Sequence, residues 1–261
     1  MNINILYQNN SLRNYNYILA CPTTREAAVI DPLNADMCLQ LAQQQNLTIT
    51  TIINTHEHFD HIEGNPKIIA ATGAKVIAHA NASIPDITQR AYAGDIINIG
   101  STIQLQVLDT PGHTFSHICL LSINTPTPAL FSGDTLFNAG CGNCRSGNVD
   151  LMYKTFTEQL YLIADHTQVY PGHDYLANNL QFALSREPNN AEIHKWIALA
   201  EKQDPQHPLI TTLAIEKQIN PFFRLDSPEI IQQLHKDFAS LPEKPNAYEV
   251  FVGLRELRNN W

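Results

Sequence analysis

The sequence is poor in basic side chains and has no long apolar run. Of its 261 residues, 16 are Lys or Arg against 25 Asp or Glu, so the formal net charge is −9. A chain this acidic is a poor ligand for nucleic-acid phosphates, which are bound by clustered cations. No run of 18 or more apolar residues occurs, so no membrane span is expected. We therefore expect neither a nucleic-acid partner nor a membrane one.

Export signals and a disulfide framework are also missing. The N-terminal segment MNINILYQNNSL has no basic stretch and no long apolar one, which favours a cytoplasmic location. The five cysteines are widely spaced and are expected to be reduced thiols. Cys141 and Cys144 form one CxxC. Because no second CxxC and no thioredoxin-like strand–helix context accompany it, a loop role is favoured over a redox or zinc role.

The segments that are present predict two domains. Apolar residues make up 44% of the chain, enough for a packed core. Short β-branched or alternating segments predict strands at 16–20, 27–31, 47–54, 75–79, 101–109, 117–123, 129–133 and 167–172, with helices at 35–45, 61–72 and 150–165. Strand signals then nearly vanish, and helices are expected at 175–186, 190–203, 209–219, 228–239 and 246–258. An α/β domain over 1–174 and a helical domain over 175–261 follow.

One segment carries four metal-ligand side chains in six positions. The sequence Thr-His-Glu-His-Phe-Asp-His directly follows the β-branched strand 47–54. In extended backbone, His56 and His58 point the same way and can share one ion. The chain then turns, so Asp60 and His61 can face a second ion. Imidazole and carboxylate are ligands of zinc and similar divalent metals, and packing needs rarely produce such a cluster.

Three further candidate ligands also follow predicted strands. They are His113 in Asp-Thr-Pro-Gly-His-Thr, Asp134 in Ser-Gly-Asp-Thr, and His173 in Tyr-Pro-Gly-His-Asp. Alone, each histidine reads better as an ordinary surface or core residue, and the aspartate as a turn residue. Beside the cluster they read as ligands, because loops after strands gather on one edge of a sheet. Two ions sharing one bridging carboxylate would use all seven side chains.

The remaining histidines and Asp31 are not predicted to be metal ligands. Five histidines lack a ligand-spaced partner and read as non-ligands: His79, His166, His194, His207 and His235. His117 reads either as structural or as a support for a ligand. Asp31, at the end of an early strand, is a candidate to orient a ligand imidazole.

Four motifs in this order, THEHFDH, DTPGHT, SGDT and YPGHDY, resemble the metallo-β-lactamase superfamily over about residues 1–175. Within it, the chain is similar to the glyoxalase II (hydroxyacylglutathione hydrolase) family. The similarity rests on FSGDTLFNAGCG (131–142), PGHDY (171–175), NPFFR (220–224) and LRELR (254–258). The resemblance implies an αββα sandwich followed by an α-helical C-terminal domain.

The resemblance also implies a site and a reaction. His56, His58 and His113 would hold one divalent ion, Asp60, His61 and His173 a second, and Asp134 would bridge them, with Asp60 and Asp134 as the catalytic carboxylates. Zinc is favoured for both ions, and iron or manganese accept the same ligands. The substrate would be a small glutathione thioester, S-D-lactoylglutathione. A hydroxide at the two ions would hydrolyse it to glutathione and D-lactate in methylglyoxal detoxification.

The substrate contacts implied by the resemblance include two departures from the family pattern. Tyr175 and Arg255 match family residues that contact glutathione, and Arg258 falls where the family usually has lysine. After Gly142 the family commonly has a basic residue and an aromatic one two positions later, whereas this chain has Asn143, Cys144 and Arg145. Ser116 stands where glycine is usual. Asn143 and Arg145 are retained as substrate-contact candidates, and the metal ligands are intact.

Several alternatives remain open. A persulfide dioxygenase or another thioesterase would share the scaffold, and oxygen consumption or substrate range would separate them. A β-lactamase is disfavoured because those enzymes place cysteine at the position of Asp134, and a nuclease is disfavoured by the −9 charge. A non-catalytic glutathione-conjugate or zinc-binding protein would bind metal tightly without turnover. A monomer is expected, although the sequence carries no oligomerisation signal.

Overall fold

The computed structural model describes all residues, 1–261, and contains two six-stranded sheets packed face to face. The first sheet has the order β1–β2–β3–β4–β5–β6 and the second β14–β13–β10–β9–β8–β7, with a separate β11–β12 hairpin. The strands of the first sheet are Asn2–Tyr7, Tyr15–Ala20, Glu26–Ile30, Thr48–Ile53, Lys75–His79 and Ile87–Ala91. Those of the second, in chain order, are Ile96–Ile99, Ile103–Asp109, Ile118–Ile123, Ala129–Gly133, Gln168–Pro171 and Thr211–Thr212. The hairpin is Leu136–Phe137 and Gly140–Cys141.

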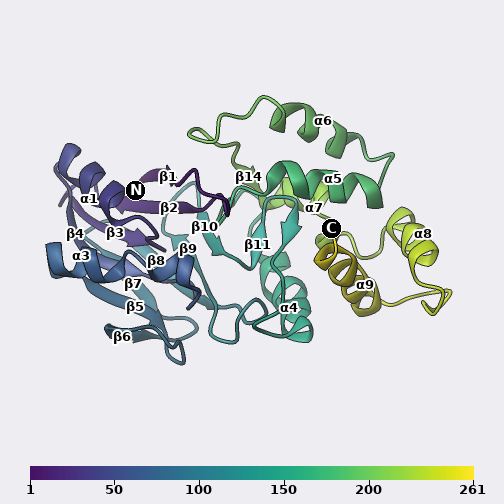
Figure 1. Cartoon of the computed structure of the whole chain (residues 1–261), viewed down its shortest axis with the longest axis horizontal. Helices are drawn as coiled ribbons and strands as arrows, with labels where there is room; N and C mark the ends of the chain where they lie inside the picture. The colour runs from purple at the N-terminus through teal and green to yellow at the C-terminus, as the bar shows by residue number, and fades with distance from the viewer.

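The helices cover the outer faces of the sandwich and form its C-terminal extension (Figure 1). They are α1 Ala35–Gln44, α2 Phe59–Ile62, α3 Asn65–Thr72, α4 Val149–Lys154, α5 Leu176–Arg186, α6 Ala191–Ala200, α7 Leu213–Ile219, α8 Pro228–Asp237 and α9 Ala247–Asn259. Short π and 3₁₀ turns occupy Thr155–Gln159, Leu160–Leu162 and Pro221–Phe223. None of the helices is long and apolar enough to cross a bilayer.

Separate apolar cores account for the layering. One core lies between the sheets, where Leu19 and Ile53 of the first sheet meet Leu120 and Phe131 of the second. A second core packs α1 and α3 on the outer face of the first sheet. A third packs α4, α8 and α9 on the outer face of the second. The expected αββα sandwich with a helical C-terminal part is therefore confirmed.

Two helices expected in the first domain differ from the structure. The segment 61–72 is split into α2 and α3 because Gly64 packs against Pro32: its N–H donates to Pro32 O at 2.8 Å, and a Cβ there would lie 2.6 Å from that oxygen. The segment 150–165 is α-helical only to Lys154 and continues as the π and 3₁₀ turns.

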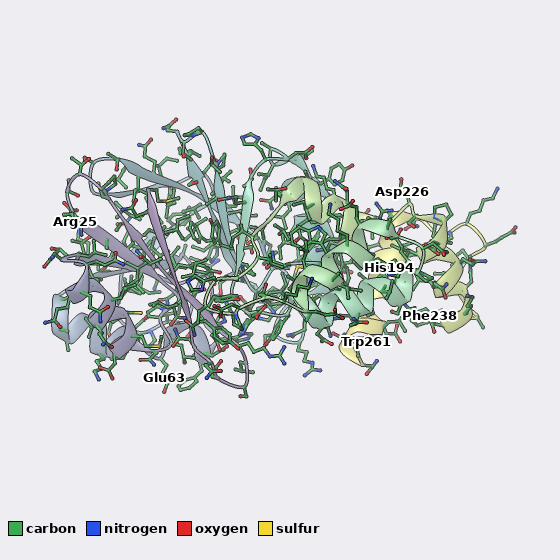
Figure 2. The ribbon with its side chains drawn as sticks, turned by 90° about the horizontal axis from the view of Figure 1, so that it is seen from above. Arg25, Glu63, His194, Asp226, Phe238 and Trp261 are labelled. Carbon is green, nitrogen blue, oxygen red and sulfur yellow. The ribbon has the colours of Figure 1, made fainter.

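The C-terminal third is tied into the sandwich. The helix expected at 209–219 begins only at Leu213, because Thr211 and Thr212 pair with β13 as the edge strand β14. Ser227 caps α8 with Pro228 in its first turn, as the sequence predicts. Seen from above, Arg25 and Glu63 lie in the sandwich, whereas Asp226 and Phe238 mark the far end of the helical part (Figure 2). The short strands β1, β6, β7, β11, β12 and β14 were not expected.

Candidate active site

Strand direction brings four loops to one edge of the sandwich. Strand β9 is antiparallel to both β8 and β10, and β10 is parallel to β13. The strands β8, β10 and β13 therefore run the same way, and the loops that carry His113, Asp134 and His173 leave the sheet together. The loop after β4 of the other sheet adds the motif residues. All seven candidate ligands are brought together, and we call them the ligand cluster.

Three imidazoles form one half of the ligand cluster. His58 Nδ1 lies 3.1 Å from His56 Nε2 and 2.9 Å from His113 Nε2. The three nitrogens lie close enough together to share one ion. Burial and the neighbouring His61 hold the pKa of His56 well below its usual range, and burial also lowers that of His113. Neutral imidazoles with inward lone pairs are what a metal requires.

The other half combines one carboxylate with two imidazoles. His61 Nε2 lies 3.3 Å from His173 Nε2, and Asp60 Oδ2 lies 3.5 Å from each of these nitrogens. Burial lowers the pKa of His61, but Asp134 and Asp31 outweigh it and raise that pKa to about 9. This half of the ligand cluster therefore holds a proton when no other cation is bound.

Asp134 lies between the two halves. Its Oδ2 is 3.1 Å from His173 Nε2 and 3.6 Å from His113 Nε2, and its Oδ1 is 3.5 Å from His61 Nε2. Burial would raise the pKa of Asp134, but the surrounding imidazoles hold it well below its usual range. Asp134 Oδ1 is buried without a hydrogen-bond partner. An orphaned carboxylate oxygen among converging ring nitrogens fits a divalent metal site.

The outer nitrogens of the buried imidazoles are held by hydrogen bonds that aim the inner ones. The acceptors and distances are Asp31 Oδ2 for His61 (3.0 Å), Leu12 O for His173 (2.8 Å), Asn143 O for His113 (2.7 Å) and Thr55 Oγ1 for His56 (3.0 Å). Thr55 in turn donates to Asp31 Oδ2 at 2.6 Å. Asp31 thus orients an imidazole of the ligand cluster, as the sequence predicts.

His117 supports the ligand cluster from below. Its Nε2 accepts the backbone N–H of Asp134 at 3.1 Å, and its Nδ1 lies 2.9 Å from Thr110 Oγ1. Burial holds the pKa of His117 well below its usual range, so the ring is neutral. The turn before Asp134 passes through Gly133 at φ +47°, where a Cβ would lie 2.7 Å from His117 Nε2. His117 therefore fixes a neighbouring turn instead of pointing at the ligand site.

A cavity of about 300 Å³ adjoins the ligand cluster. We call it the arginine pocket; its wall consists of Phe137, Cys141, Asn143, Arg145, Tyr175, Asn178, Arg255, Arg258, Asn259 and Trp261. All five expected substrate-contact residues are among them. The Tyr175 ring stacks on the His173 ring, with centroids 4.9 Å apart and planes 1° apart. The backbone oxygen of Asn143 accepts from His113. The pocket and the ligand cluster thus share supporting contacts.

The arginines of this pocket lack carboxylate partners. Arg255 is 4% exposed, and its Nη1 donates to Cys141 O at 2.6 Å and Gly142 O at 3.1 Å. Arg258 Nη2 donates to Asn179 Oδ1 at 2.9 Å. Burial, followed by the charge of Arg255, lowers the pKa of Arg258. Guanidinium groups that are buried (Arg255) or half-buried (Arg258) and donate only to neutral oxygens are suited to bind an anion.

Comparison with known proteins identifies the family. Residues 11–174 match the family model of the metallo-beta-lactamase superfamily, and residues 174–261 match that of the hydroxyacylglutathione hydrolase C-terminus. A hydroxyacylglutathione hydrolase of Nitrosococcus oceani is 50% identical over 100% of both chains. The chain belongs to the hydroxyacylglutathione hydrolase family.

Other members agree with this assignment, and one solved structure shares the fold. A hydroxyacylglutathione hydrolase from a Polaromonas species is 51% identical over 98% of each chain. A cytoplasmic one from Arabidopsis thaliana is 37% identical, over 85% of this chain and 88% of its own. The crystal structure of ETHE1 from Myxococcus xanthus has a TM-score of 0.68 at 30% identity, covering 93% of each chain. The match to the hydroxyacylglutathione hydrolase C-terminus favours the hydrolase over the dioxygenase alternative.

The departures from the family pattern have local explanations. Ser116 Oγ donates to Glu57 Oε2 at 2.6 Å, so its hydroxyl ties the loop after His113 to the motif loop. Asn143 keeps its backbone oxygen on His113, while its Oδ1 accepts the N–H of Arg145 at 3.1 Å. Burial raises the pKa of the Cys141 thiol, and raises that of Cys144 to about 11. These are protonated thiols without a disulfide. Cys144 lies in a loop as expected, whereas Cys141 lies in the hairpin strand β12.

Sequence reasoning missed two residues of the candidate site, Asn14 and Phe137. Asn14 Nδ2 donates to Asp60 Oδ2 at 2.9 Å and orients that carboxylate. Phe137 packs its ring edge against His173 and Tyr175, at centroid distances of 5.8 and 5.1 Å. Phe137 stands in the 131–142 segment that carries the family resemblance, which is a signal for it. Asn14 lies in no motif and has none.

Proposed function

We propose that this chain hydrolyses S-(2-hydroxyacyl)glutathione, with S-D-lactoylglutathione as the preferred substrate, to glutathione and a 2-hydroxy acid. The chain is a thioester hydrolase of the hydroxyacylglutathione hydrolase type. The observation that carries the substrate proposal is the adjacency of the ligand cluster and the arginine pocket through the His173–Tyr175 stack. This adjacency suits a molecule that has a reactive carbonyl at one end and carboxylates at the other.

We also propose that the ligand cluster holds two divalent ions, with zinc favoured over iron or manganese. His56, His58 and His113 would hold one ion, Asp60, His61 and His173 the other, and Asp134 would join them. Three groups of three side chains lie within ligand distance, and two of them, His56–His58–His113 and Asp60–His61–His173, support this division. In the third, Asp31, His56 and His61, the Asp31 carboxylate is already engaged by His61 Nδ1 and Thr55. When bound, such ions lower the pKa of a water molecule and polarise a carbonyl oxygen.

The chain's own residues position the other reacting parts. Asp60, whose side chain is 20% exposed, is the more accessible carboxylate of the ligand cluster and is held by Asn14; we assign it the orientation of the attacking water. Arg255 and Arg258 would neutralise the glycine carboxylate of glutathione. Tyr175 lies between the ligand cluster and the arginines of the arginine pocket, and would pack on the peptide part of glutathione. Asn143 and Arg145 would complete the glutathione contacts.

Hydrolysis of S-D-lactoylglutathione by zinc-reconstituted protein tests the proposed function. We expect kcat/KM of about 10⁴ M⁻¹s⁻¹ or above, with two metal ions per chain by elemental analysis. No thioester hydrolysis at full metal occupancy would overturn the proposal and would favour a non-catalytic binding protein. Oxygen consumption with a glutathione persulfide would instead favour the dioxygenase alternative.

We further propose a cytoplasmic monomer built of a catalytic domain, 1–174, and a substrate-binding domain, 175–261. Residues of a single chain line both the ligand cluster and the arginine pocket, which supports a monomer. The family matches that meet at residue 174 support the domain boundary. A solution mass of about one chain would agree with the monomer, and a dimer mass would contradict it.

A further inference from the structure

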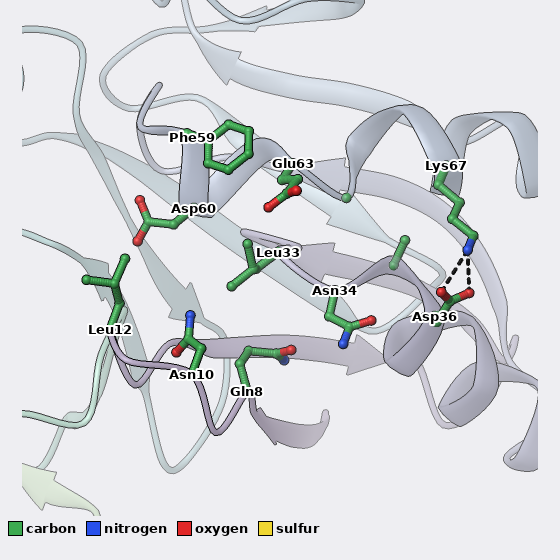
Figure 3. A pocket seen from close by; sticks show the side chains of 12 residues that line it. Gln8, Asn10, Leu12, Leu33, Asn34, Asp36, Phe59, Asp60, Glu63 and Lys67 are labelled. Atoms are coloured by element: carbon green, nitrogen blue, oxygen red, sulfur yellow. Dashed lines mark hydrogen bonds and ion pairs between the residues drawn. The ribbon is translucent and has the colours of Figure 1, made fainter.

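A separate cavity of about 570 Å³ lies beside Asp60, and we call it the Asp60 cavity. It opens between the β1–β2 loop, the loop after β3, and the α2–α3 segment (Figure 3). Its wall includes Asn10, Leu12, Leu33, Phe59, Asp60 and Glu63. It shares no residue with the arginine pocket, so a substrate that fills one leaves the other free.

The wall of the Asp60 cavity is also the edge of the ligand cluster. Asp60 lines the cavity, and its Oδ2 lies 3.5 Å from the Nε2 atoms of His61 and His173. Leu12 lines it too, and its backbone oxygen accepts from His173 Nδ1 at 2.8 Å. A thioester carbonyl at the ligand cluster therefore has this cavity within reach of its acyl substituent.

Two apolar side chains of the cavity wall, Phe59 and Leu12, are exposed to solvent instead of packing in a core. Phe59 is 68% exposed and Leu12 is 45% exposed. Each would be unremarkable alone, because single exposed apolar residues are common. Together with Leu33 they line one concavity that also holds convergent polar groups, which is how ligand sites are built. An apolar group on the ligand is the partner that such a wall fits.

The charge on this wall is opposite to that of the arginine pocket. Asp60 and Glu63 lie on one side of the cavity, and Figure 3 shows both near Phe59. The only cation on the wall, Lys67, is paired with Asp36 at 2.7 Å at the far end. Asp60 is also part of the ligand cluster, where bound cations would offset its charge, so Glu63 is the carboxylate of this wall that has no cationic partner. It would repel a carboxylate on the ligand.

We propose that the Asp60 cavity is the acyl subsite, which accepts uncharged acyl groups larger than lactoyl and rejects acidic ones. This inference rests on the proposed function and names the part of the substrate that the arginine pocket leaves unassigned. The volume of the cavity falls within the roughly 300–1,000 Å³ of sites for drug-sized ligands, well beyond the needs of a lactoyl group. Phe59 and Leu12 would pack on the acyl chain, and Glu63 would exclude a second carboxylate.

Hydrolysis of three glutathione thioesters tests the apolar wall and the acidic wall. For Phe59→Ala, we expect kcat/KM for S-mandeloylglutathione to fall about fivefold or more relative to S-lactoylglutathione. The matched control is Phe115→Ala, because Phe115 is 63% exposed on another loop of the ligand cluster but lies outside the cavity; it should leave the ratio unchanged. For Glu63→Lys, the S-succinyl to S-lactoyl ratio should rise about tenfold, while the exposed Glu243→Lys should not change it.

A binding measurement separates failure of this inference from failure of the proposed function. Calorimetry should show tighter binding of S-benzylglutathione than of S-methylglutathione, and Phe59→Ala should remove most of that difference. Ratios and affinities that do not respond to Phe59→Ala and Glu63→Lys would overturn the acyl subsite, even in an active enzyme. A wild-type protein that hydrolyses no thioester would overturn the function, while the benzyl preference would still report on the cavity.

Discussion

The ligand cluster and the arginine pocket are neighbours with opposite charge imbalances. The ligand cluster gathers carboxylates and imidazoles and leaves Asp134 Oδ1 without a partner. The arginine pocket holds one buried and one half-buried guanidinium group, Arg255 and Arg258, which donate only to neutral oxygens. The ligand cluster therefore fits cations and the arginine pocket fits an anion. A substrate that spans both is recognised by its charge in the arginine pocket and activated at the ligand cluster.

The ligand cluster and the arginine pocket are also formed by different structural elements. Loops after strands of both sheets converge on the ligand cluster, so its geometry depends on the sandwich as a whole. Arg255 and Arg258 lie three residues apart on α9 and share one face of that helix. We therefore expect changes in the ligand cluster to affect metal content and turnover, and changes in α9 to affect substrate affinity alone.

The largest expected effect is loss of the metal centre. The double variant His58→Ala and Asp134→Ala removes one ligand of the first half and the carboxylate between the halves. We expect kcat/KM to fall about 10³-fold or more, with reduced metal content by elemental analysis. His194→Ala is the control, because His194 contacts only the Pro188 oxygen. Wild-type turnover and metal content in the double variant would contradict the assignment.

Crowding Asp134 without removing a ligand should have a smaller effect. A Cβ on Gly172 would overlap Asp134 Oδ1 and lie 2.9 Å from His61 Cε1. Gly172→Ala should therefore displace the carboxylate and reduce kcat about 10- to 100-fold, together with metal affinity. Gly253→Ala is a matched control, since its Cβ would meet a flexible leucine tip at 3.3 Å and Phe238 Cε2 at an ordinary contact distance of 3.5 Å. Unchanged metal affinity and kcat in Gly172→Ala would show that this contact does not matter.

A change in the arginine pocket should affect substrate affinity instead of turnover. Arg258→Met retains the apolar stem and removes the charge. We expect KM for S-lactoylglutathione to rise about tenfold or more, because a charge-assisted hydrogen bond contributes about 1.5–3 kcal/mol, with kcat and metal content near wild type. Arg90→Met, on the distant strand β6, controls for net charge. A drop in kcat with an unchanged KM would place Arg258 in turnover instead of binding.

The smallest expected effect concerns Glu216, which ties the helical part to the β11–β12 hairpin. It accepts from Thr211 Oγ1 at 2.7 Å, Ala139 N at 2.9 Å and Asn220 Nδ2 at 2.9 Å. Burial outweighs these hydrogen bonds and raises the pKa of Glu216 to about 7. An unfolded glutamate loses its proton at lower pH, so this group's stabilisation is full below about pH 4.5 and is lost as the pH rises to about 7.

Glu216→Gln should remove that pH dependence. We expect the unfolding free energy of the variant, relative to wild type, to increase between about pH 5 and pH 8, as measured by urea denaturation. The exposed Glu243→Gln should give parallel curves. Parallel curves for Glu216→Gln would mean that Glu216 is ionised in the folded chain throughout this range.

The sequence predicted the ligand cluster better than its surroundings, for a physical reason. His56, His58, Asp60 and His61 follow a β-branched strand in one short segment, so local geometry was sufficient. Asn14 reaches Asp60 across 46 residues, and no local pattern reports such a contact. The Asp60 cavity likewise depends on how the β1–β2 loop approaches α2.

The fold was predicted where periodicity is strong and missed where burial is weak. Strand β4 has a β-branched run and was expected, whereas β6 is mostly exposed and has no alternating pattern. The break between α2 and α3 comes from a tertiary contact of Gly64 with Pro32, which helix propensity cannot report. The two-residue strand β14 exists only through its pairing with β13.

The central claim is that one substrate spans the ligand cluster and the arginine pocket. A comparison of two thioesters that share the lactoyl group tests it most directly. The thiol is glutathione in one and N-acetylcysteamine, which has no carboxylate, in the other. We predict that wild-type kcat/KM is about 100-fold higher for the glutathione thioester, and that Arg258→Met reduces this gap to less than about tenfold. Equal kcat/KM for the two thioesters in the wild type would contradict the account.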